Sequence, residues 1–556
     1  MRNEPAMSAF QRVSYLEQLA KSTVDLLIIG GGVTGAGIAL DAAARGLTVG
    51  LVEKQDFASG TSSRSTKLVH GGLRYLKQGD VQLVREVGRE RTILHRNAPH
   101  IVIPEKMILP IVEKGTYGKL ATSVGLYLYD LLAGVKRKER RKMLSKQETL
   151  LAEPLLRHDI LKGSGLYYEY RTDDARLTIE VLKTASAYGA ICLNYTEATD
   201  FIYTNGRVAG IFAKDQVTGK SYTLTAKKIV NAAGPWVDRL REKDHSLSGK
   251  RLHLTKGVHL VVPYDRLPLR QAVYFDVADK RMIFAIPRNR STYIGTTDTN
   301  YQGELERPSV TRQDVDYLLQ AVNDMFPNVH LTEKDITSSW AGLRPLIHED
   351  GKSPSELSRK DEVFFSNSGL ITIAGGKLTG FRKMAERVVD IVAGQLAKEE
   401  GRVFKPCNTH EIVLAGGAFS SAAAIPTYIR EQVQRLHAAG EQSFAETAVT
   451  ELVGKYGSNT EKIITSMIDL RNQGRQLEEA MNLAELHYGI QEEMVVTLRD
   501  YLIRRTGKLF FERESIQHVY GKLANSMART FNWTAREIER EVKLFEAEYQ
   551  QVKTFY

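Results

Sequence analysis

The clearest hydrophobic pattern lies near the N-terminus, where an apolar run meets a cluster of glycines. Residues 24–29 (VDLLII) predict a buried strand, the small-residue stretch to about Arg45 predicts a helix, and residues 48–52 (TVGLV) predict a second strand. The turn between the first strand and the helix carries Gly30, Gly32 and Gly35 in the order G-x-G-x-x-G, and the second strand ends at Glu53. These elements together predict a βαβ unit.

This unit has the residue types that a bound dinucleotide requires. Gly30 permits the tight turn, Gly32 lets the backbone approach a pyrophosphate, and Gly35 lets helix and strand pack closely. The helix N-terminus offers N–H donors to the phosphates, and Glu53 stands where a carboxylate accepts the ribose hydroxyls. We therefore predict a dinucleotide-binding site.

Two later strand-to-glycine segments, 227–237 with Gly234 and 370–386 with Gly376, are expected to return to the same sheet. Such a split arrangement suits a permanently bound FAD. Between them, alternating segments such as 200–226, with its Asn205-Gly206 hairpin signal, and 281–297 predict a mainly antiparallel second sheet. From about residue 410 helical periodicity dominates.

The predicted fold class is therefore α/β, with three parts. A Rossmann-like FAD-binding domain within residues 1–400 is interleaved with an antiparallel-sheet substrate domain, mainly at about 100–170 and 200–345. Residues 401–556 are expected to form a C-terminal all-α domain. A chain of 556 residues is long enough for several domains.

The composition limits which classes of protein this chain can belong to and which partners it can have. The two cysteines, Cys192 and Cys407, lie far apart and outside any CxxC pattern, so neither a disulfide framework nor a metal site is expected. No signal peptide or membrane-spanning run is evident, which predicts a cytoplasmic protein. A net charge of +10 allows nucleic acid, an anionic membrane surface or an anionic small substrate as a partner.

Residues 68–76 (LVHGGLRYL) place His70 and Arg74 on either side of a glycine pair, with Tyr75 directly after the arginine. Glycines give up side-chain packing and cost backbone entropy, so a strand or helix has little use for them there. We expect a ligand to approach the backbone closely at this point.

Five motifs, in this order and at these separations, resemble the FAD-dependent glycerol-3-phosphate dehydrogenases of the aerobic bacterial type. They are IIGGGVTGAGIALDAAARG, DFASGTSSRSTKLVHGGLRYL, IVNAAGPWVD, AGLRPL and GGKLTGFRKMAE. The likeness extends to YLIRRTGKLFFE in the helical tail. The resemblance implies oxidation of sn-glycerol 3-phosphate to dihydroxyacetone phosphate, with hydride passing to FAD and electrons to a membrane quinone.

The resemblance also implies a set of site residues. Arginine matches two phosphate oxygens with its planar fork, so arginines are the preferred partners of a phosphate dianion. The substrate-binding candidates carried over by motif are Arg74, Tyr75, Arg344, Arg359 and Lys377. Arg344 lies between Leu343 and Pro345, which we interpret as an apolar turn; it is expected to stabilise the developing alkoxide as well.

The catalytic base is expected to be His70 or His259, because histidine titrates near neutral pH; the sequence does not decide between them. Lys377 follows two glycines and precedes a helix, so both the lysine and the helix N-terminus are expected to face negative charge on the flavin. Hydroxyl groups of Thr61, Ser62 and Ser65 are further expected FAD contacts.

The segment 118–142 joins an apolar, aromatic stretch to a run with six basic residues among seven, Lys136–Lys142. Such a segment suits peripheral contact with an anionic membrane at the inner face of the cell membrane. The alternative is a buried helix followed by a solvated loop. No RNA-binding module is evident, so nucleic acid is not expected as a partner, and self-association into a homo-oligomer is left open.

Two alternative activities use the same fold. A glycerol-3-phosphate oxidase would return the electrons to oxygen. An amine or amino-acid oxidase would need one carboxylate clamp and a neutral amine site rather than several cations.

Overall fold

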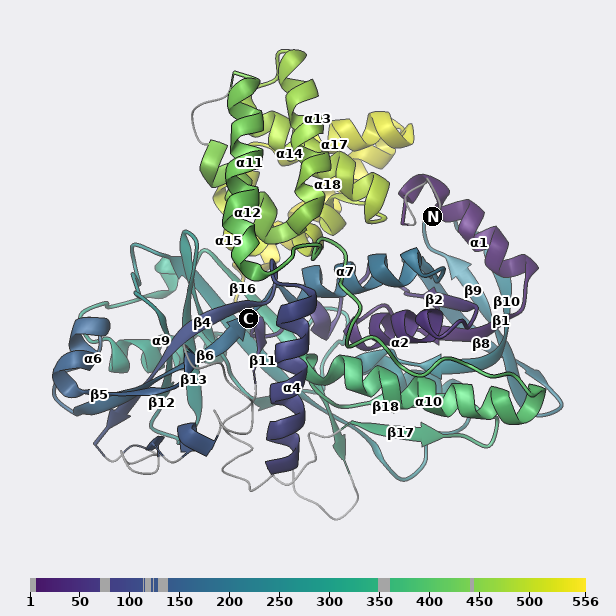
Figure 1. The fold of residues 1–556 in the computed structure, drawn as a ribbon, viewed down its shortest axis with the longest axis horizontal. Helices are drawn as coiled ribbons and strands as arrows, with labels where there is room; N and C mark the ends of the chain where they lie inside the picture. Colours follow the sequence, from purple (N-terminus) through teal and green to yellow (C-terminus); the bar gives the residue numbers. More distant parts are fainter. Residues whose placement is uncertain are drawn as a thin grey trace.

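The computed structural model describes residues 7–70, 81–113, 115, 122–123, 125–128, 139–348, 361–440 and 445–556. Two sheets lie side by side, and a helical domain sits over one end of both (Figure 1). Arg74, Tyr75, Arg359 and Lys136–Lys138 lie outside the described residues.

The first sheet has the strand order β17-β18-β10-β1-β2-β7. The pairs from β18 to β7 are parallel, and β17 runs antiparallel at the edge. Its central strand, β1, is buried at every position, as expected for a strand covered on both faces. The strands are β1 (Val24–Ile29), β2 (Val49–Val52), β7 (Ile191–Leu193), β10 (Ser221–Asn231), β17 (Glu362–Phe365) and β18 (Ile371–Ala374).

The predicted βαβ unit is present, with α2 (Val33–Ala44) between β1 and β2. Helix α2 lies between α7 (Asp174–Ala187) and α10 (Phe381–Glu400), and all three cover one face of the sheet (Figure 1). A Cβ atom at Gly37 would lie 2.8 Å from the Phe381 ring, so the small residues of α2 allow α10 to approach closely. The domain also contains α1 (Arg12–Lys21), α4 (Val81–Asn97) and α8 (Val237–Lys243).

The second sheet has the order β15-β11-β14-β13-β12-β4-β6-β3, with β16 on β11 and β5 on β6. Its pairs are antiparallel except β4 with β12. The strands are β3 (Leu68–Val69), β4 (Ile103–Val112), β5 (Lys142–Ser145), β6 (Leu161–Arg171), β11 (Arg251–Pro263), β12 (Ala272–Asp276), β13 (Met282–Arg288), β14 (Ser291–Gly295), β15 (Thr299–Asn300) and β16 (Ser338–His348). Helices α6 (Lys146–Ala152) and α9 (Arg312–Met325) accompany this sheet.

The segment 200–226 does not lie in the second sheet as we expected. The hairpin β8 (Thr196–Thr204) and β9 (Arg207–Asp215) pairs with the first half of β10, whose second half pairs with β1. The turn itself is as predicted, because Asn205 and Gly206 both have positive φ. Alternation of apolar and polar residues shows that one face of a strand is covered, but it does not indicate which sheet the strand joins.

The C-terminal domain is all helical. It contains α11 (Ile425–Ala438), α12 (Ala445–Tyr456), α13 (Thr460–Asn472), α14 (Leu477–Glu492), α15 (Lys508–Phe511), α16 (Arg513–Ile516), α17 (Tyr520–Phe531) and α18 (Ala535–Gln551), with a π-helical turn over Asp500–Arg505. Within the described part of the chain, no helix has the length and apolar character needed to span a membrane.

Candidate active site

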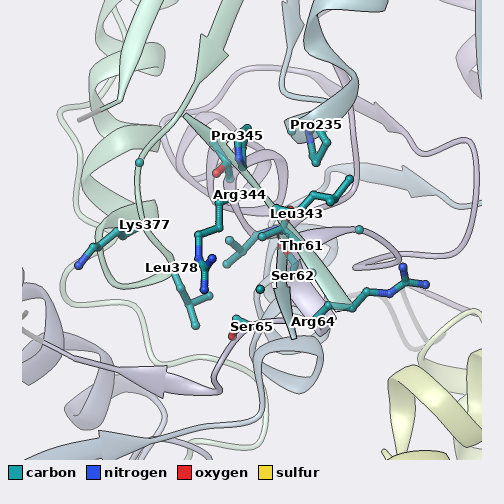
Figure 2. A pocket seen from close by; sticks show the side chains of 18 of the residues that line it. Thr61, Ser62, Arg64, Ser65, Pro235, Leu343, Arg344, Pro345, Lys377 and Leu378 are labelled. Carbon is teal, nitrogen blue, oxygen red and sulfur yellow. Dashed lines mark hydrogen bonds between the residues drawn. The ribbon is translucent and has the colours of Figure 1, made fainter. Parts of the chain in front are cut away.

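A cavity of about 630 Å³ lies where the carboxyl ends of β1, β2, β10 and β18 face the second sheet. In open α/β sheets, ligands bind in the crevice outside these strand ends. From the second sheet, β11 and β16 contribute His259 and Arg344 to the lining. Figure 2 shows the loops from both sheets around the cavity.

The glycine turn after β1 is shaped by close backbone contacts on one side and open space on the other. Gly30 has φ +120°, and a Cβ atom at Gly35 would lie 1.9 Å from the Gly30 carbonyl oxygen. Gly32, by contrast, faces the cavity, and its Cβ would meet only the Ser62 hydroxyl, at 3.2 Å. The backbone at Gly32 is therefore accessible to a ligand at the N-terminus of α2.

Glu53 lies at the end of β2, as predicted, and lines the same cavity. Its carboxylate accepts hydrogen bonds from the backbone N–H groups of Gly31, at 2.8 Å, and Gln55, at 2.9 Å. Burial raises the pKa of Glu53. The side chain thus fixes the glycine turn while it faces the ligand space.

The hydroxyl loop 59–66 joins the two sheets. Thr61 donates to the Leu343 carbonyl oxygen on β16, at 2.8 Å, and Ser62 Oγ accepts from Val33 N, at 3.0 Å. The Ser65 carbonyl oxygen accepts from Trp340 Nε1, at 3.2 Å. Thr61, Ser62 and Ser65 all line the cavity, and Gly234 and Gly376 line it from the returning segments.

Arg344 lies within the long strand β16, not in the apolar turn we expected. Leu343 and Pro345 belong to an eleven-residue strand, in which Leu343 is buried and Pro345 is partly buried, so their apolar character reflects a sheet position rather than a turn. The guanidinium donates to Thr296 Oγ1, at 3.0 Å, and pairs with Asp298 Oδ1, at 3.1 Å. A Cβ atom at Gly257 would lie 2.4 Å from it, so this glycine on β11 makes room for the guanidinium.

His259 is buried on β11, with its ring stacked on Trp340 at a centroid distance of 4.8 Å. Its Nε2 atom forms a 3.0 Å hydrogen bond with Thr66 Oγ1, and Nδ1 has no hydrogen-bond partner among the described residues. Burial, together with the charges of Arg344 and Lys67, lowers the pKa of His259 well below 6.5. The ring is therefore neutral near pH 7, and the same burial makes it a weaker base than an exposed histidine.

His70 follows β3 and is partly buried at the cavity. Its carbonyl oxygen accepts from Thr379 Oγ1, at 3.2 Å, and its ring lies 6.3 Å from that of Phe284. Lys377 lines the cavity between Gly376 and the short helix Leu378–Gly380. In Figure 2 its side chain points away from the Arg344 guanidinium, so these two cations do not converge in this structure.

An aromatic and cationic group on the second sheet was not among the predicted site residues. Tyr274 and Phe284 stack at 4.1 Å, and both line the cavity beside Lys280 and Arg281. Arg281 pairs with Asp279. The only sequence signal was the run 279–284 (DKRMIF), in which charges directly precede an apolar strand.

Glu306 was not predicted as a site residue, but it bonds to three side chains that line the cavity. Its Oε1 atom accepts from Lys54 Nζ and Arg239 Nη1, both at 2.8 Å, and from Trp236 Nε1, at 2.9 Å. Burial alone would raise the pKa of Glu306, but the hydrogen bonds from Lys54 and Trp236 outweigh it and lower the pKa to about 2.

Among the described residues, no group of histidine, cysteine or acidic side chains could hold a metal ion.

Comparison with known proteins matches both halves of the chain. The family model "FAD dependent oxidoreductase" matches residues 25–382, and "C-terminal domain of alpha-glycerophosphate oxidase" matches residues 407–538. The aerobic glycerol-3-phosphate dehydrogenase of Bacillus subtilis (strain 168) is 51% identical over 527 residues, covering 95% of this chain and 94% of the relative. The chain belongs to the family of aerobic glycerol-3-phosphate dehydrogenases. The enzyme of that name from Staphylococcus haemolyticus (strain JCSC1435) is 50% identical over 545 residues, 97% of each chain.

Solved structures agree with this family assignment. The glycerol-3-phosphate dehydrogenase from Bacillus halodurans, complexed with FAD, has a TM-score of 0.85 at 46% identity and covers 99% of both chains. L-α-glycerophosphate oxidase from Mycoplasma pneumoniae shares the fold at 18% identity, with a TM-score of 0.54, covering 70% of this chain and 97% of that one.

The cofactor of this glycerol-3-phosphate dehydrogenase family member is FAD, as the sequence predicted. The cavity fits such a group: the open space at Gly32, the free end of α2 and the buried Glu53 carboxylate all face it. The fold class predicted from sequence is confirmed as well, with an FAD-binding sheet, a second sheet and a helical C-terminal domain.

Proposed function

We propose that the protein oxidises sn-glycerol 3-phosphate to dihydroxyacetone phosphate and passes the electrons to a membrane quinone, as a step of glycerol catabolism. The near full-length identity to aerobic glycerol-3-phosphate dehydrogenases supports this proposal. Within the structure, the observation that carries it is the placement of Arg344 and His259 on paired strands in the flavin cavity.

Bound FAD supplies a two-electron acceptor for the hydride of C2. His259 or His70 accepts the proton of the C2 hydroxyl; the placement of both at the cavity supports this role, while burial keeps His259 neutral but lowers its basicity. Arg344 has a side chain about 30% exposed to the cavity and offers N–H donors to the phosphate or to the developing alkoxide. The roles of Arg74, Tyr75, Arg359 and Lys377 in phosphate binding remain predictions.

A second candidate, glycerol-3-phosphate oxidase activity, is favoured by the C-terminal match to an α-glycerophosphate oxidase domain. The two activities differ only in the final electron acceptor. Purified enzyme supplied with glycerol 3-phosphate, oxygen and a soluble ubiquinone or menaquinone analogue tests this. We expect quinone reduction without comparable hydrogen peroxide; peroxide formed at the rate of substrate oxidation would favour the oxidase.

We further propose that the segment 118–142 docks the enzyme on the cytoplasmic face of the cell membrane. In its described part, the side chains of Tyr127 and Leu128 are exposed, and Arg141 lies 5.6 Å from the Tyr127 ring. Apolar and aromatic groups next to cations suit a bilayer interface.

Replacing the basic residues among Lys136–Lys142 with glutamine tests the membrane proposal. We expect weaker flotation with anionic liposomes and unchanged reduction of a soluble dye. As a control, glutamine at the three exposed basic residues of helix α18, Arg536, Arg540 and Lys543, should leave flotation unaltered, whereas glutamine at three basic residues of 136–142 should already weaken it. Liposome binding that survives the change in 136–142 would contradict this role.

A further inference from the structure

The loop that follows β2 is held from two sides. Its first residue, Glu53, bonds to Gly31 of the glycine turn, and Ala58 N donates to the Gly31 carbonyl oxygen, at 3.0 Å. A Cβ atom at Gly31 would lie 2.8 Å from Phe57, so the loop 53–58 packs directly under the turn. Any displacement of this loop would therefore move both the Glu53 carboxylate and the backbone that faces FAD.

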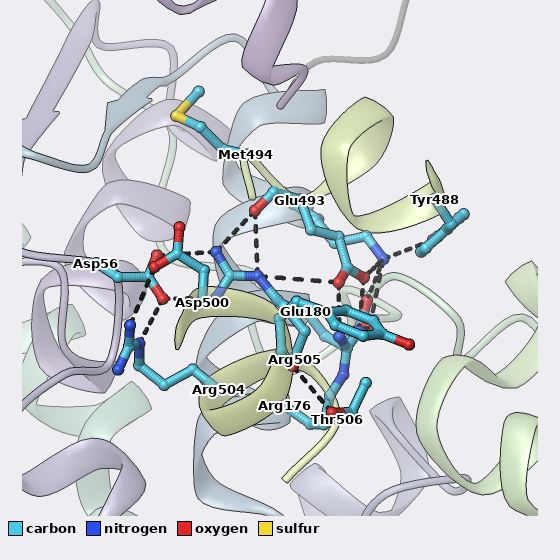
Figure 3. A network of polar contacts seen from close by, with 12 residues as sticks. Asp56, Arg176, Glu180, Tyr488, Glu493, Met494, Asp500, Arg504, Arg505 and Thr506 are labelled. Atoms are coloured by element: carbon cyan, nitrogen blue, oxygen red, sulfur yellow. Dashed lines mark hydrogen bonds and ion pairs between the residues drawn. The ribbon is translucent and has the colours of Figure 1, made fainter. Parts of the chain in front are cut away.

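The other side of the loop is bound by the C-terminal domain. The Asp56 carboxylate is 1% exposed and receives a bidentate pair from Arg505, at 2.8 and 2.9 Å. Arg504 donates to the same carboxylate, and Asn194 Nδ2 does so at 3.0 Å. Figure 3 shows Asp56 facing the two arginines. Both arginines belong to the IRRTG stretch of the helical tail.

The arginines are in turn fixed within their own domain. Arg505 is 1% exposed and also donates to the Glu493 carbonyl oxygen, at 2.8 Å. Arg504 pairs with Asp500, at 3.0 Å. Asp56, Asp500 and Arg505 are buried and Arg504 is nearly so, and all are paired, so loss of one member leaves a buried charge without its partner.

A second connection runs through Tyr195. Its backbone N–H donates to the Gln55 carbonyl oxygen, at 2.7 Å, and its hydroxyl donates to Asp500 Oδ1, at 2.6 Å. The loop 53–58 is thus joined to the turn Asp500–Arg505 at two points, through Asp56 and through Tyr195. Both connections end on the same C-terminal turn.

From these contacts we propose that the C-terminal helical domain serves to retain FAD, with Arg505 as a positioning residue that holds the loop 53–58 against the glycine turn through Asp56. The fork of arginine suits this role because it fixes the carboxylate plane at two oxygens. The domain thereby acts on cofactor binding without contacting the cavity through Arg505.

The test compares FAD release from holoenzyme variants, followed as the rise in fluorescence of free FAD after large dilution into flavin-free buffer. We expect Asp56→Asn and Arg505→Met each to release FAD about tenfold faster or more, since even one lost charged hydrogen bond has an effect of that order. The rate of FAD release from Arg505→Lys should lie between the rates of these two variants and that of the wild type. Release from the double variant should be close to that from either single one, because both remove the same contact.

Lys508→Met is the matched control. Lys508 pairs with Glu485 at 3.0 Å, is as buried as Arg505, and lies three residues along the chain, but both members of that pair belong to the helical domain. It should lower the thermal unfolding midpoint without accelerating FAD release at temperatures well below unfolding. If Arg505→Met does not fold, the rate of FAD release from Arg505→Lys is compared with that from Lys508→Arg instead.

Two results would overturn the proposal. One is FAD release at the wild-type rate from Asp56→Asn and Arg505→Lys. The other is equal acceleration by the Lys508 variants, which would mean that general stability of the helical domain, rather than the Asp56 contact, governs retention.

Discussion

His259 Nε2 lies 3.0 Å from Thr66 Oγ1, and the same imidazole ring is stacked on Trp340. The ring is thereby held in one orientation at the cavity, while burial keeps its pKa well below 6.5. Buried histidines of this kind stay neutral where an exposed one would already be protonated.

This relationship predicts the pH dependence of the reaction. If His259 is the base, kcat/KM should stay level as the pH falls below 6.5, because the group that must be unprotonated has a depressed pKa. The measurement is kcat/KM for glycerol 3-phosphate with a soluble dye between pH 5 and 8, which reports ionisations of the free enzyme. An acid limb centred near pH 6.5 that disappears in His70→Asn would assign the base to His70 instead.

A second buried histidine predicts how stability responds to pH. Burial, with the nearby charges of Arg176 and Lys183, lowers the pKa of His100 to about 3, and neither ring nitrogen has a hydrogen-bond partner among the described residues. Since the folded pKa is depressed, the unfolded state binds an additional proton below about pH 6.5. Stability should therefore fall as the pH drops, by about 2 kcal/mol from this group between pH 6.5 and 5.

His100→Phe removes the titrating group and keeps a ring beside Phe419, 6.5 Å away in the wild type. We expect urea unfolding of the holoenzyme to lose less stability between pH 6.5 and 5 in this variant. His259 and His487, whose pKa values are also lowered, should keep part of the slope. An unchanged slope would show that His100 is not charged on unfolding in this range.

Two substitutions in the glycine turn are expected to have different effects, one on cofactor binding and the other on folding. Gly32→Val should give folded protein with little flavin, because its side chain would enter the ligand space and its Cβ meets only the Ser62 hydroxyl, at 3.2 Å. Gly35→Ala should instead impair folding, since its Cβ would overlap the Gly30 carbonyl oxygen. The ratio of flavin to protein absorbance, with far-ultraviolet circular dichroism, distinguishes the two; full flavin occupancy in Gly32→Val would refute the role of Gly32.

How much of this site was predictable from sequence depended on how local each interaction is. The turn with Gly30, Gly32 and Gly35 and the acid at Glu53 lie within one βαβ unit, where residue spacing fixes geometry. The resemblance predicts Arg344 as a site residue, but the interpretation of Leu343 and Pro345 as an apolar turn is wrong, because both lie within a long strand. The segment 200–226 has the predicted turn at Asn205-Gly206 but joins the first sheet rather than the second, since alternation of apolar and polar residues carries no information on the partner strand.

Contacts between segments that are distant in the sequence could not be predicted from local sequence patterns. Asp56 and Arg505 are 449 residues apart, and neither has a local signal that names the other. Glu306 likewise lies in a polar loop and becomes important only because the fold brings Lys54 and Trp236 to it.

Arg344 provides a test of the anion site. Arg344→Ala should reduce kcat/KM for glycerol 3-phosphate by about ten- to a hundredfold while FAD is kept, because a charged hydrogen bond contributes about 1.5–3 kcal/mol. Arg344→Lys should recover only part, since an ammonium cannot reproduce the arginine fork. Arg266→Ala removes a surface arginine paired with Asp335 near the same sheet and should leave kcat/KM unchanged. Near-normal kcat/KM in Arg344→Ala would show that Arg344 does not bind the phosphate. Arg281, which also lines the cavity, would then be the next candidate for the anion site.

The most direct test of the central claim is an anaerobic titration of the purified holoenzyme with sn-glycerol 3-phosphate, followed by visible absorbance. The proposed function predicts that the flavin band bleaches with stoichiometric formation of dihydroxyacetone phosphate, and that glycerol at the same concentration leaves the band intact. A flavin that stays oxidised with glycerol 3-phosphate, or that is bleached equally well by glycerol or an amino acid, would contradict it.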